Sequence, residues 1–197
     1  TQSCAEQPLP PHGTCPLASI NLAQLVSAPF TPDARLDVTQ LRQLVRVAVR
    51  MLDNTLDVSR FALDAQGQQA QGQRRIGVGV TGVANAIAML GVRYGSSKAV
   101  FLLGSWMQTI QNVAYGASAL LAKERGAFPL YDADKHLASQ GIQALDQDIR
   151  ALVEQHGLRN GTLTTIAPTG TTSMFAGNVS SGIEPIFSTS FTRTIIT

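Results

Sequence analysis

The sequence predicts an α/β fold. Strand-like segments near residues 17–26, 76–80 and 163–166 are separated by long segments with helical periodicity, and this alternation is typical of α/β architectures. The 197 residues are enough for one ordinary domain. Because we find no internal repeat and no clear domain boundary, we treat residues 1–197 as a single segment.

The first third of the chain is predicted to be a loop followed by a helix. Residues 1–16 contain four prolines and a glycine, which prevent a regular helix. Asp37 belongs to the residue types that cap helix amino termini. Apolar residues then recur every three or four positions, which predicts an amphipathic helix over residues 38–58. Residues 63–73 are polar and rich in Gln and Gly, so we expect an exposed loop there.

The remaining elements follow from the same patterns. In chain order we expect a strand at 76–80, helices at 82–91, about 96–125, 133–139 and 143–156, a strand at 163–166 and a last strand near 186–196. Gly91 and Gly126 stand just after two of these helices, where glycine commonly ends a helix. Two small-residue loops, Pro168–Ser173 and 177–182, precede the last strand.

The charge content is unusually low. Asp, Glu, Lys and Arg make up 14% of the chain, against about 25% in a typical soluble domain. With 44% hydrophobic residues, a disordered, highly charged chain is excluded. The net charge is +2 and the longest basic cluster is Arg74-Arg75, so a direct nucleic-acid partner is not expected. We predict that the chain by itself exposes apolar patches or hides them by self-association. It starts at Thr1 without Met and ends in strand-like residues, so we expect a segment of something longer.

Several features indicate a cytoplasmic protein. Two cysteines in 197 residues do not make a disulfide-rich secreted scaffold, and no signal peptide opens the chain. The uncharged stretch Ala99–Ala122 has the length of a membrane span. However, it carries many amide and hydroxyl groups, which are costly in lipid. We therefore expect a helix buried inside a large protein and no membrane partner.

The segment Gly77–Gly82 matches the G-x-G-x-x-G pattern between a predicted strand and a predicted helix. A dinucleotide site would also need an acidic residue about 20 positions later. No Asp or Glu occurs between Gly82 and Glu124. Close packing of a helix against its neighbours is therefore the preferred interpretation of these glycines.

The loop Pro168–Ser173 follows a predicted strand. Backbone N–H groups of a glycine-containing turn, followed by hydroxyls, can bind a phosphate. The Gly-Lys-Ser/Thr of a P-loop is absent. An ordinary turn between a strand and a loop explains the residues as well, and both interpretations stay open on the residues alone.

Cys4 and Cys15 are eleven residues apart on the proline-rich loop. This spacing fits no zinc site, and the three histidines add no ligand pattern, so no metal site is predicted. Buried, inert cysteines are one interpretation. The other is a redox or radical thiol, because Glu6 would lie on the same side of an extended loop as Cys4 and supply a proton acceptor. His156, Arg74-Arg75 and Lys123–Arg125 are interpreted as helix ends or solvated positions.

Taken together, the motifs resemble the adenosylcobalamin-dependent (class II) ribonucleotide reductases. The resemblance covers nearly the whole chain in the order of the family. The matching segments are Cys4–Pro11, Gly13–Cys15, Ser19–Leu22, Met51–Asn54, Arg74–Gly82, Ile166–Thr171 and Gly177–Pro185. The fold that the resemblance implies is about half of a ten-stranded α/β barrel, with residues 1–16 as its finger loop and residues 163–185 as phosphate-binding loops.

The resemblance also implies roles for individual residues. Cys4 would be the thiyl radical that abstracts the 3′-hydrogen of the ribose, and Glu6 would accept the proton of the 3′-hydroxyl. Cys15 would be one of two cysteines that deliver reducing equivalents. The residues that would contact the substrate are Ser3 and Ala5 beside the radical cysteine, and Pro168, Thr169, Gly170, Thr171 and Thr172 around its phosphates.

One position departs from the family. Its members have Asn-Pro before the radical cysteine, where this chain has Gln2-Ser3. Gln2 keeps the amide but is one methylene longer, which changes the reach of the contact that the family makes to the ribose hydroxyls.

The resemblance implies several partners as well. These are a ribonucleotide, with the diphosphate expected over the triphosphate, adenosylcobalamin bound mostly outside this chain, the remaining parts of the barrel, and a thioredoxin- or glutaredoxin-type reductant. A homo-oligomer is a further expectation. Because those other parts are needed, we predict that the chain alone has no reductase activity. The alternatives are a non-catalytic nucleotide- or phosphate-binding module and a purely structural half-barrel.

Overall fold

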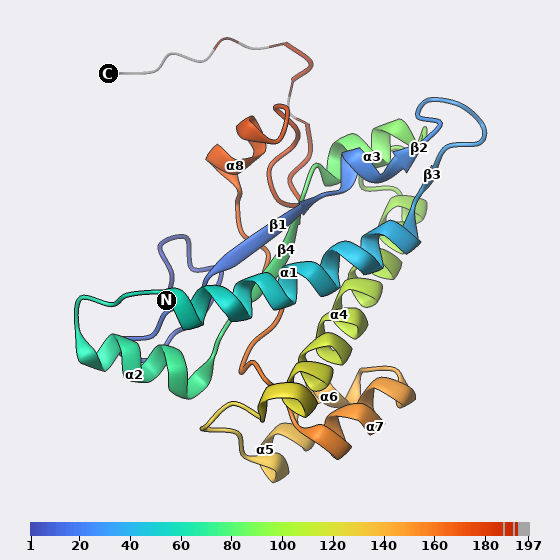
Figure 1. Cartoon of the computed structure of the whole chain (residues 1–197). Coiled ribbons are helices and arrows are strands. Elements are labelled where there is room, and N and C mark those ends of the chain that lie inside the picture. Colours follow the sequence, from blue (N-terminus) through green and yellow to red (C-terminus); the bar gives the residue numbers. More distant parts are fainter. Residues whose placement is uncertain (187, 191, 193–197) are drawn as a thin grey trace.

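A computed structural model describes residues 1–186, 188–190 and 192. The described residues form two small sheets surrounded by helices (Figure 1). In the first sheet, β1 (Leu17–Asn21) pairs in parallel with β4 (Gly77–Thr81), so that Leu17 lies opposite Gly77. In the second, β2 (Val26–Ser27) pairs antiparallel with β3 (Arg35–Leu36). The α/β class is confirmed.

The barrel itself is not closed within the described residues. The third predicted strand, at 163–166, is reduced to a single parallel bridge between Val78 and Thr164. Backbone hydrogen bonds still tie this segment to β4, because Val78 N–H donates to Leu163 O and Thr165 N–H donates to Val78 O. Three parallel segments therefore lie side by side. The strand predicted near 186–196 lies largely outside the described residues.

The glycines of the G-x-G-x-x-G segment serve close packing. All five residues of β4 are buried. A Cβ on Gly79 would stand 2.3 Å from the backbone oxygen of Thr165, and one on Gly77 would meet Leu17 and Thr165 at 2.6 Å. The adjacent segment can approach β4 only because these positions lack side chains. The glycines therefore do serve close packing, but of strand segments and not of the helix that the sequence analysis expected.

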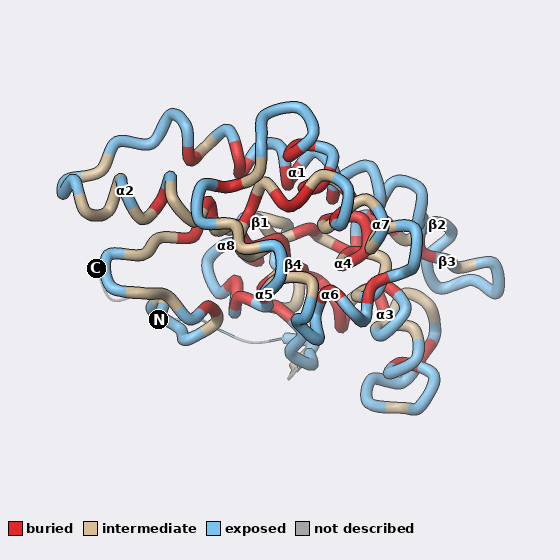
Figure 2. The backbone as a smooth tube through the Cα atoms, turned by 90° about the horizontal axis from the view of Figure 1, so that it is seen from below, coloured by how far each residue is buried: buried red, intermediate tan, exposed pale blue. Residues whose placement is uncertain are grey.

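Two long helices cover the sheet. Helix α1 (Val38–Val58) begins at Asp37, whose side chain accepts the N–H of Gln40. Helix α4 (Ser97–Arg125) begins at the capping residue Ser96 and ends at Gly126. Both agree with the sequence prediction. Helix α1 packs on β1, β4 and α4, and its inward face is buried while its outward face is exposed (Figure 2).

The shorter helices surround this centre. They are η1 (Leu22–Leu25), a 3-10 helix, and the α-helices α2 (Asp64–Gln73), α3 (Val83–Met89), α5 (Ala133–Leu137), α6 (Gln140–Gln143), α7 (Gln147–His156) and α8 (Gly170–Phe175). The helix predicted at 143–156 is α7, which begins only at Gln147, and the short helix α6 before it was not predicted. They are separate because Ser139 caps the first and a new helix begins after Asp146.

Two predicted loops proved wrong. Residues 64–73 form α2, because Gln and Ala are good helix formers and Ala70 anchors the helix in the core. The loop predicted over Pro168–Ser173 becomes helical from Gly170. In both places the small and polar residues were taken for turn signals, although each segment packs against the rest of the chain.

The expectation of exposed apolar side chains is met along α1 and α4. The exposed large residues on these helices include Leu44, Val47, Met51, Val58, Val100, Phe101 and Leu120. Within the described part of the chain, no helix is both long and apolar enough to cross a membrane. The uncharged stretch Ala99–Ala122 lies in α4, which packs against α1 and α7.

Candidate active site

The amino-terminal loop is a compact turn, not an extended segment. Gln2 N–H donates to Gln7 O at 3.0 Å, and Ala5 N–H donates to Gln2 O at 2.9 Å. Ala5 has a φ of 62°, in the left-handed region. The prediction that Cys4 and Glu6 face one side of an extended strand is therefore wrong in its geometry, because the turn reverses the chain between them.

The turn nevertheless brings Cys4 and Glu6 together. The carboxylate oxygen Oε2 of Glu6 accepts the backbone N–H of Cys4 at 3.0 Å. The Cys4 side chain is exposed and forms no disulfide. The tip of the loop thus presents an accessible thiol beside a half-buried carboxylate. Ser3 and Ala5, on either side of Cys4, are also exposed.

Gln2 connects this tip to Cys15. Its amide nitrogen Nε2 donates to the backbone oxygen of Cys15 at 2.6 Å. The other amide atom, Oε1, is buried and has no hydrogen-bond partner among the described residues. The amide at the position that departs from the family pattern therefore holds the two ends of the loop together.

Cys15 lies in a very different environment from Cys4. It is buried and is a free thiol. Burial raises the pKa of the Cys15 thiol from 9.0 to about 11, although a hydrogen bond with Thr162 and the charge of Arg75 act in the opposite direction. The negative charge of Glu6 adds to the increase. Cys15 is therefore protonated at neutral pH.

The loop is attached to the strand-like segment beside β4. The hydroxyl of Thr165 donates to the backbone oxygen of Glu6 at 2.8 Å. Thr165 is itself held on β4 by its N–H bond to Val78. Thr165 thus helps to place Glu6, and the predicted phosphate loop begins three residues after Thr165, at Pro168.

The predicted phosphate loop lies at the carboxyl ends of β1 and β4, where α/β proteins commonly bind ligands. The hydroxyl of Thr81, the last residue of β4, lies 3.1 Å from the Thr169 hydroxyl and donates to Ser180 O at 2.9 Å. At the end of β1, Asn21 Nδ2 donates to Ala176 O at 2.9 Å. Both loops of the carboxyl-terminal region are therefore fixed at one edge of the sheet.

Thr169 has a structural part in this arrangement. Its φ is 52°, and its buried hydroxyl accepts the N–H of Gly182 at 2.7 Å. Pro168, Gly170, Thr171 and Thr172 are exposed. The hydroxyl of Thr169 thus makes its hydrogen bonds within the protein, whereas the first turn of α8, which follows it, is exposed.

The residues that position these loops were missed from the sequence. Thr81, Asn21, Thr165 and Ser180 form the contacts just described, and Asn85 on α3 accepts the N–H of Ser180 at 2.7 Å. A usable signal existed, because Asn21 and Thr81 are the polar last residues of two apolar strands. Among the described residues, no three His, Cys, Asp or Glu side chains are grouped to hold a metal ion.

The burial of Arg74 differs from the sequence prediction. Arg74 was predicted to be solvated, but its side chain is 2% exposed and pairs with Asp53 at 2.8 Å, and Asp53 itself is fully buried. The group around this carboxylate, here called the Asp53 cluster, consists of Asp53, Asp57, Arg74, Arg125, Arg159 and Asn160. The cause is tertiary, because three arginines from separate segments converge on one carboxylate.

Comparison with known proteins identifies the family of the chain. The family described as "Ribonucleotide reductase, barrel domain" matches residues 1–197. The chain belongs to this ribonucleotide reductase family. The match spans both the cysteine loop and the phosphate loop, and so includes every residue of the candidate site.

Individual relatives in this reductase family carry more specific names. The vitamin B12-dependent ribonucleoside-diphosphate reductase of Mycobacterium tuberculosis is 41% identical over 196 residues, covering 100% of this chain and 25% of the relative. The protein of the same name from Thermoplasma acidophilum is 36% identical, with 100% and 23% covered. The ribonucleoside-diphosphate reductase subunit alpha of Chlamydia muridarum is 32% identical, with 91% and 19% covered. The chain spans about a quarter of the length of these relatives.

Proposed function

We propose that this chain forms the part of a vitamin B12-dependent ribonucleoside-diphosphate reductase that carries the radical cysteine and the phosphate loop. The observation that supports this most directly is the turn at Cys4. It places an exposed thiol beside a carboxylate that is held by the backbone of the same turn. The names of the relatives support both the diphosphate substrate and the cobalamin requirement.

The reaction needs a thiol that is accessible to a cofactor bound outside this chain. Adenosylcobalamin, when bound, would supply the radical equivalent that converts the Cys4 thiol to a thiyl radical. The exposure of Cys4 fits this requirement. Most of the cofactor site is expected on other parts of the reductase, because the chain spans about a quarter of the length of these relatives.

Cys4, Glu6 and Cys15 would each carry out a different step of the reaction on the substrate. The Cys4 sulfur takes the 3′-hydrogen atom, which leaves a radical on C3′, while Glu6 accepts the proton of the 3′-hydroxyl. The 2′-hydroxyl leaves as water. Cys15 and a second cysteine outside this chain supply two electrons and two protons and become a disulfide. One proton of the cysteine pair leaves with the water and the other goes to C2′. Glu6 finally returns its proton to the 3′-oxygen and Cys4 returns the hydrogen atom to C3′, so the thiyl radical and the carboxylate are both regenerated.

The environments of the two cysteines suit these different roles. A thiyl radical must meet both the cofactor and the substrate, and Cys4 is exposed. A reducing thiol must keep its proton until it is used, and burial holds the pKa of Cys15 at about 11. Gln2, which donates to the Cys15 carbonyl, keeps the two cysteines in one folded loop.

The phosphate groups are assigned to the exposed start of α8. Gly170, Thr171 and Thr172 offer backbone N–H groups and hydroxyls at the carboxyl end of the sheet, and such groups bind anions. Thr169 supports them by anchoring the turn through Thr81 and Gly182. We further propose a cytoplasmic enzyme that receives electrons from a thioredoxin- or glutaredoxin-type protein.

The test is turnover by the complete reductase that contains this segment. The assay contains adenosylcobalamin, a ribonucleoside diphosphate and a dithiol, and it measures deoxyribonucleotide. Cys4→Ala is expected to abolish product, because no other group can carry the radical, whereas Ser97→Ala, an exposed change outside the site, leaves turnover intact. The isolated chain is expected to be inactive. Full turnover by Cys4→Ala would contradict the proposal and would favour a non-catalytic phosphate-binding module.

A further inference from the structure

Cys15 lies at the amino-terminal end of the first sheet, next to the chain that leads into β4. Strand β1 begins two residues after Cys15, at Leu17, and β4 begins two residues after Arg75, at Gly77. Because Leu17 lies opposite Gly77 in the parallel ladder, Cys15 and Arg75 occupy matching positions just before their strands. The Gly77 N–H donates to Pro16 O at 3.0 Å and holds the two segments together at this end.

Thr162 reaches the same end of the sheet from the segment on the other side of β4. Its carbonyl accepts the N–H of Ile76 at 3.1 Å, and its hydroxyl donates to the Ile76 carbonyl at 3.1 Å. The Thr162 hydroxyl also forms a hydrogen bond with the Cys15 side chain. A hydroxyl can both accept and donate, so the same group accepts from a thiol and can turn to donate to a thiolate.

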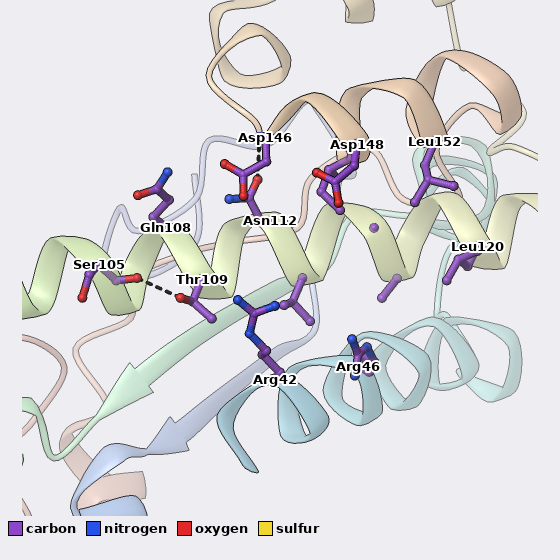
Figure 3. A pocket seen from close by; sticks show the side chains of 14 residues that line it. Arg42, Arg46, Ser105, Gln108, Thr109, Asn112, Leu120, Asp146, Asp148 and Leu152 are labelled. Carbon is purple, nitrogen blue, oxygen red and sulfur yellow. Dashed lines mark hydrogen bonds between the residues drawn. The ribbon is translucent and has the colours of Figure 1, made fainter. Parts of the chain in front are cut away.

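Arg75 carries a positive charge that no carboxylate neutralises. It is half-buried, and its Nε donates to the side-chain oxygen Oε1 of Gln73. Among the residues that the structure describes, it forms no ion pair. Arg74 is instead buried in the Asp53 cluster, and Arg42 is exposed in an open groove between α1, α4 and α7 (Figure 3). A half-buried charge without a counterion is costly to keep, which points to a negative charge that forms nearby during function.

The disulfide of the proposed reaction supplies such a charge when it is reduced, and the proposal below therefore rests on the proposed function. A dithiol reduces a disulfide when its thiolate attacks one sulfur and the other sulfur leaves as a thiolate. Cys15 is 3% exposed, so the attack is expected on the second cysteine, outside this chain. The Cys15 sulfur is then the leaving group.

Burial makes Cys15 a poor leaving group. It raises the pKa of the thiol to about 11, and a thiolate of higher pKa leaves more slowly. The hydrogen bond with Thr162 and the charge of Arg75 both favour the thiolate, whereas the charge of Glu6 disfavours it. The first two groups thus lie where the charge of the departing sulfur develops.

We propose that Arg75 and Thr162 stabilise the Cys15 thiolate as it leaves the disulfide. The S–S bond breaks, the attacking thiolate forms a mixed disulfide with the second cysteine, and the electron pair of the broken bond goes to Cys15. The other thiolate of the dithiol then attacks the mixed disulfide, which frees the second cysteine and leaves the dithiol as a cyclic disulfide. Two electrons pass to the cysteine pair, and the two protons that the dithiol released are taken up by the two cysteines.

The test uses the complete reductase that contains this segment. The enzyme turns over without dithiol until the cysteine pair is oxidised, is mixed with dithiothreitol, and the return of thiols is followed with time. Arg75→Gln and Thr162→Val are each expected to slow this reduction about tenfold, the effect of losing one interaction with a charged group. Arg75→Lys keeps the charge and should restore most of the rate. Arg60→Gln, at an exposed arginine just after α1, is the matched control and should be reduced like the wild type.

The first turnover distinguishes this role from a structural one. Enzyme that is reduced beforehand and freed of dithiol forms its first deoxyribonucleotide without any reduction of a disulfide. Both variants are therefore expected to form this product at close to the wild-type rate, whereas a disturbed fold would slow both steps. Circular dichroism shows whether each variant is folded, and Thr162→Val serves for the test if Arg75→Gln is not.

A monothiol shows which sulfur leaves. 2-Mercaptoethanol cannot close a ring, so its mixed disulfide with the oxidised enzyme accumulates and is located by peptide mapping after an acid quench. The mixed disulfide is expected on the second cysteine, with Cys15 recovered as a free thiol.

Several results would overturn the proposal. Wild-type reduction rates in both Arg75→Gln and Thr162→Val would do so, and so would a mixed disulfide on Cys15. An Arg75→Lys variant as slow as Arg75→Gln would show that the charge is not responsible, and equal slowing of both steps would make the role structural. The proposed function itself would fail on different results, namely a wild-type enzyme that forms no deoxyribonucleotide in the first turnover or that forms it without a disulfide at Cys15.

Discussion

The cysteine loop and the Asp53 cluster use polar side chains in opposite ways. In the loop, Cys4 is exposed and Glu6 is half buried, and the loop depends on a few hydrogen bonds. In the cluster, Asp53 is fully buried, and Arg74, Arg125 and Arg159 all contact its carboxylate. The difference indicates that the cluster stabilises the fold while the loop keeps its reactive groups accessible.

The strongest test of this contrast is Asp53→Ala. The change removes the buried carboxylate from Arg74, which keeps only the more exposed Asp57 as an ionic partner, and it also removes one of the two acceptors of Asn160 Nδ2. Loss of one partner from a buried ion pair costs about 3–5 kcal/mol, so a decrease of that size in the free energy of unfolding is expected in urea. Glu154→Ala, at an exposed carboxylate with no partner among the residues that the structure describes, should change little. Equal effects of the two variants would refute the structural role of the cluster.

The next largest effect concerns the pH dependence of stability. Because the pKa of Cys15 is raised to about 11 from 9.0, the folded chain keeps a proton that the unfolded chain loses above pH 9. The stability from this thiol is complete below pH 9 and is lost as the pH rises to about 11. The loss amounts to about 2–3 kcal/mol.

Urea unfolding at several pH values between 8 and 11 measures this loss. Cys15→Ala should remove it, and Cys4→Ala should leave it unchanged, since Cys4 is exposed. Other groups titrate in the same range, so the comparison is between variants and not between pH values alone. An identical pH profile in wild type and Cys15→Ala would show that burial of this thiol has no such consequence.

A third experiment probes the junction between the sheet and the loop. A Cβ at Gly79 would stand 2.3 Å from Thr165 O, and Thr165 also binds Glu6 O. Gly79→Ala is therefore expected to lower stability by about 1–3 kcal/mol through overpacking. At Gly104 on α4, an added Cβ would meet no atom within 4 Å apart from the backbone of its own helix. Gly104→Ala should therefore raise stability by about 0.5–1 kcal/mol. Thermal unfolding of both variants checks the opposite signs.

The smallest effect is expected in the cysteine loop itself. Gln2→Asn is one methylene shorter and cannot reach the Cys15 carbonyl, a contact of 2.6 Å in this chain. The loss of one hydrogen bond costs about 0.5–1.5 kcal/mol, with faster proteolysis of residues 1–16 as the local readout. Ser3→Ala, which removes no such contact, is the control. A loss as large as that of Asp53→Ala would mean that the loop is a main source of stability.

Much of the fold follows from local patterns. The apolar spacing and the capping residues Asp37 and Ser96 predicted α1 and α4 with nearly their observed bounds. The Gln-rich segment 63–73 failed because glycine and polar residues were interpreted as a loop, whereas packing of Ala70 decides for a helix.

The candidate site was found in part. The sequence, through its resemblance to the family, singled out Cys4, Glu6, Cys15 and the loop after Pro168, and their roles stay predictions. It could not show that Ala5 turns the chain, because a positive φ at alanine has no local signature. Nor could it show that the Thr169 hydroxyl is occupied by Thr81, a residue 88 positions away.

By itself, then, the sequence determined the long helices and the α/β class, because these depend on residues near one another in the chain. Only the tertiary structure decided which charges are buried. Arg42 and Arg74 are the same residue type, yet one lines an open groove and the other is sealed against Asp53. Burial of a charge depends on partners from distant segments, and the order of residues does not reveal them. Only 14% of the residues are charged, and the tertiary fold decides which of these side chains are buried in ion pairs and which are exposed.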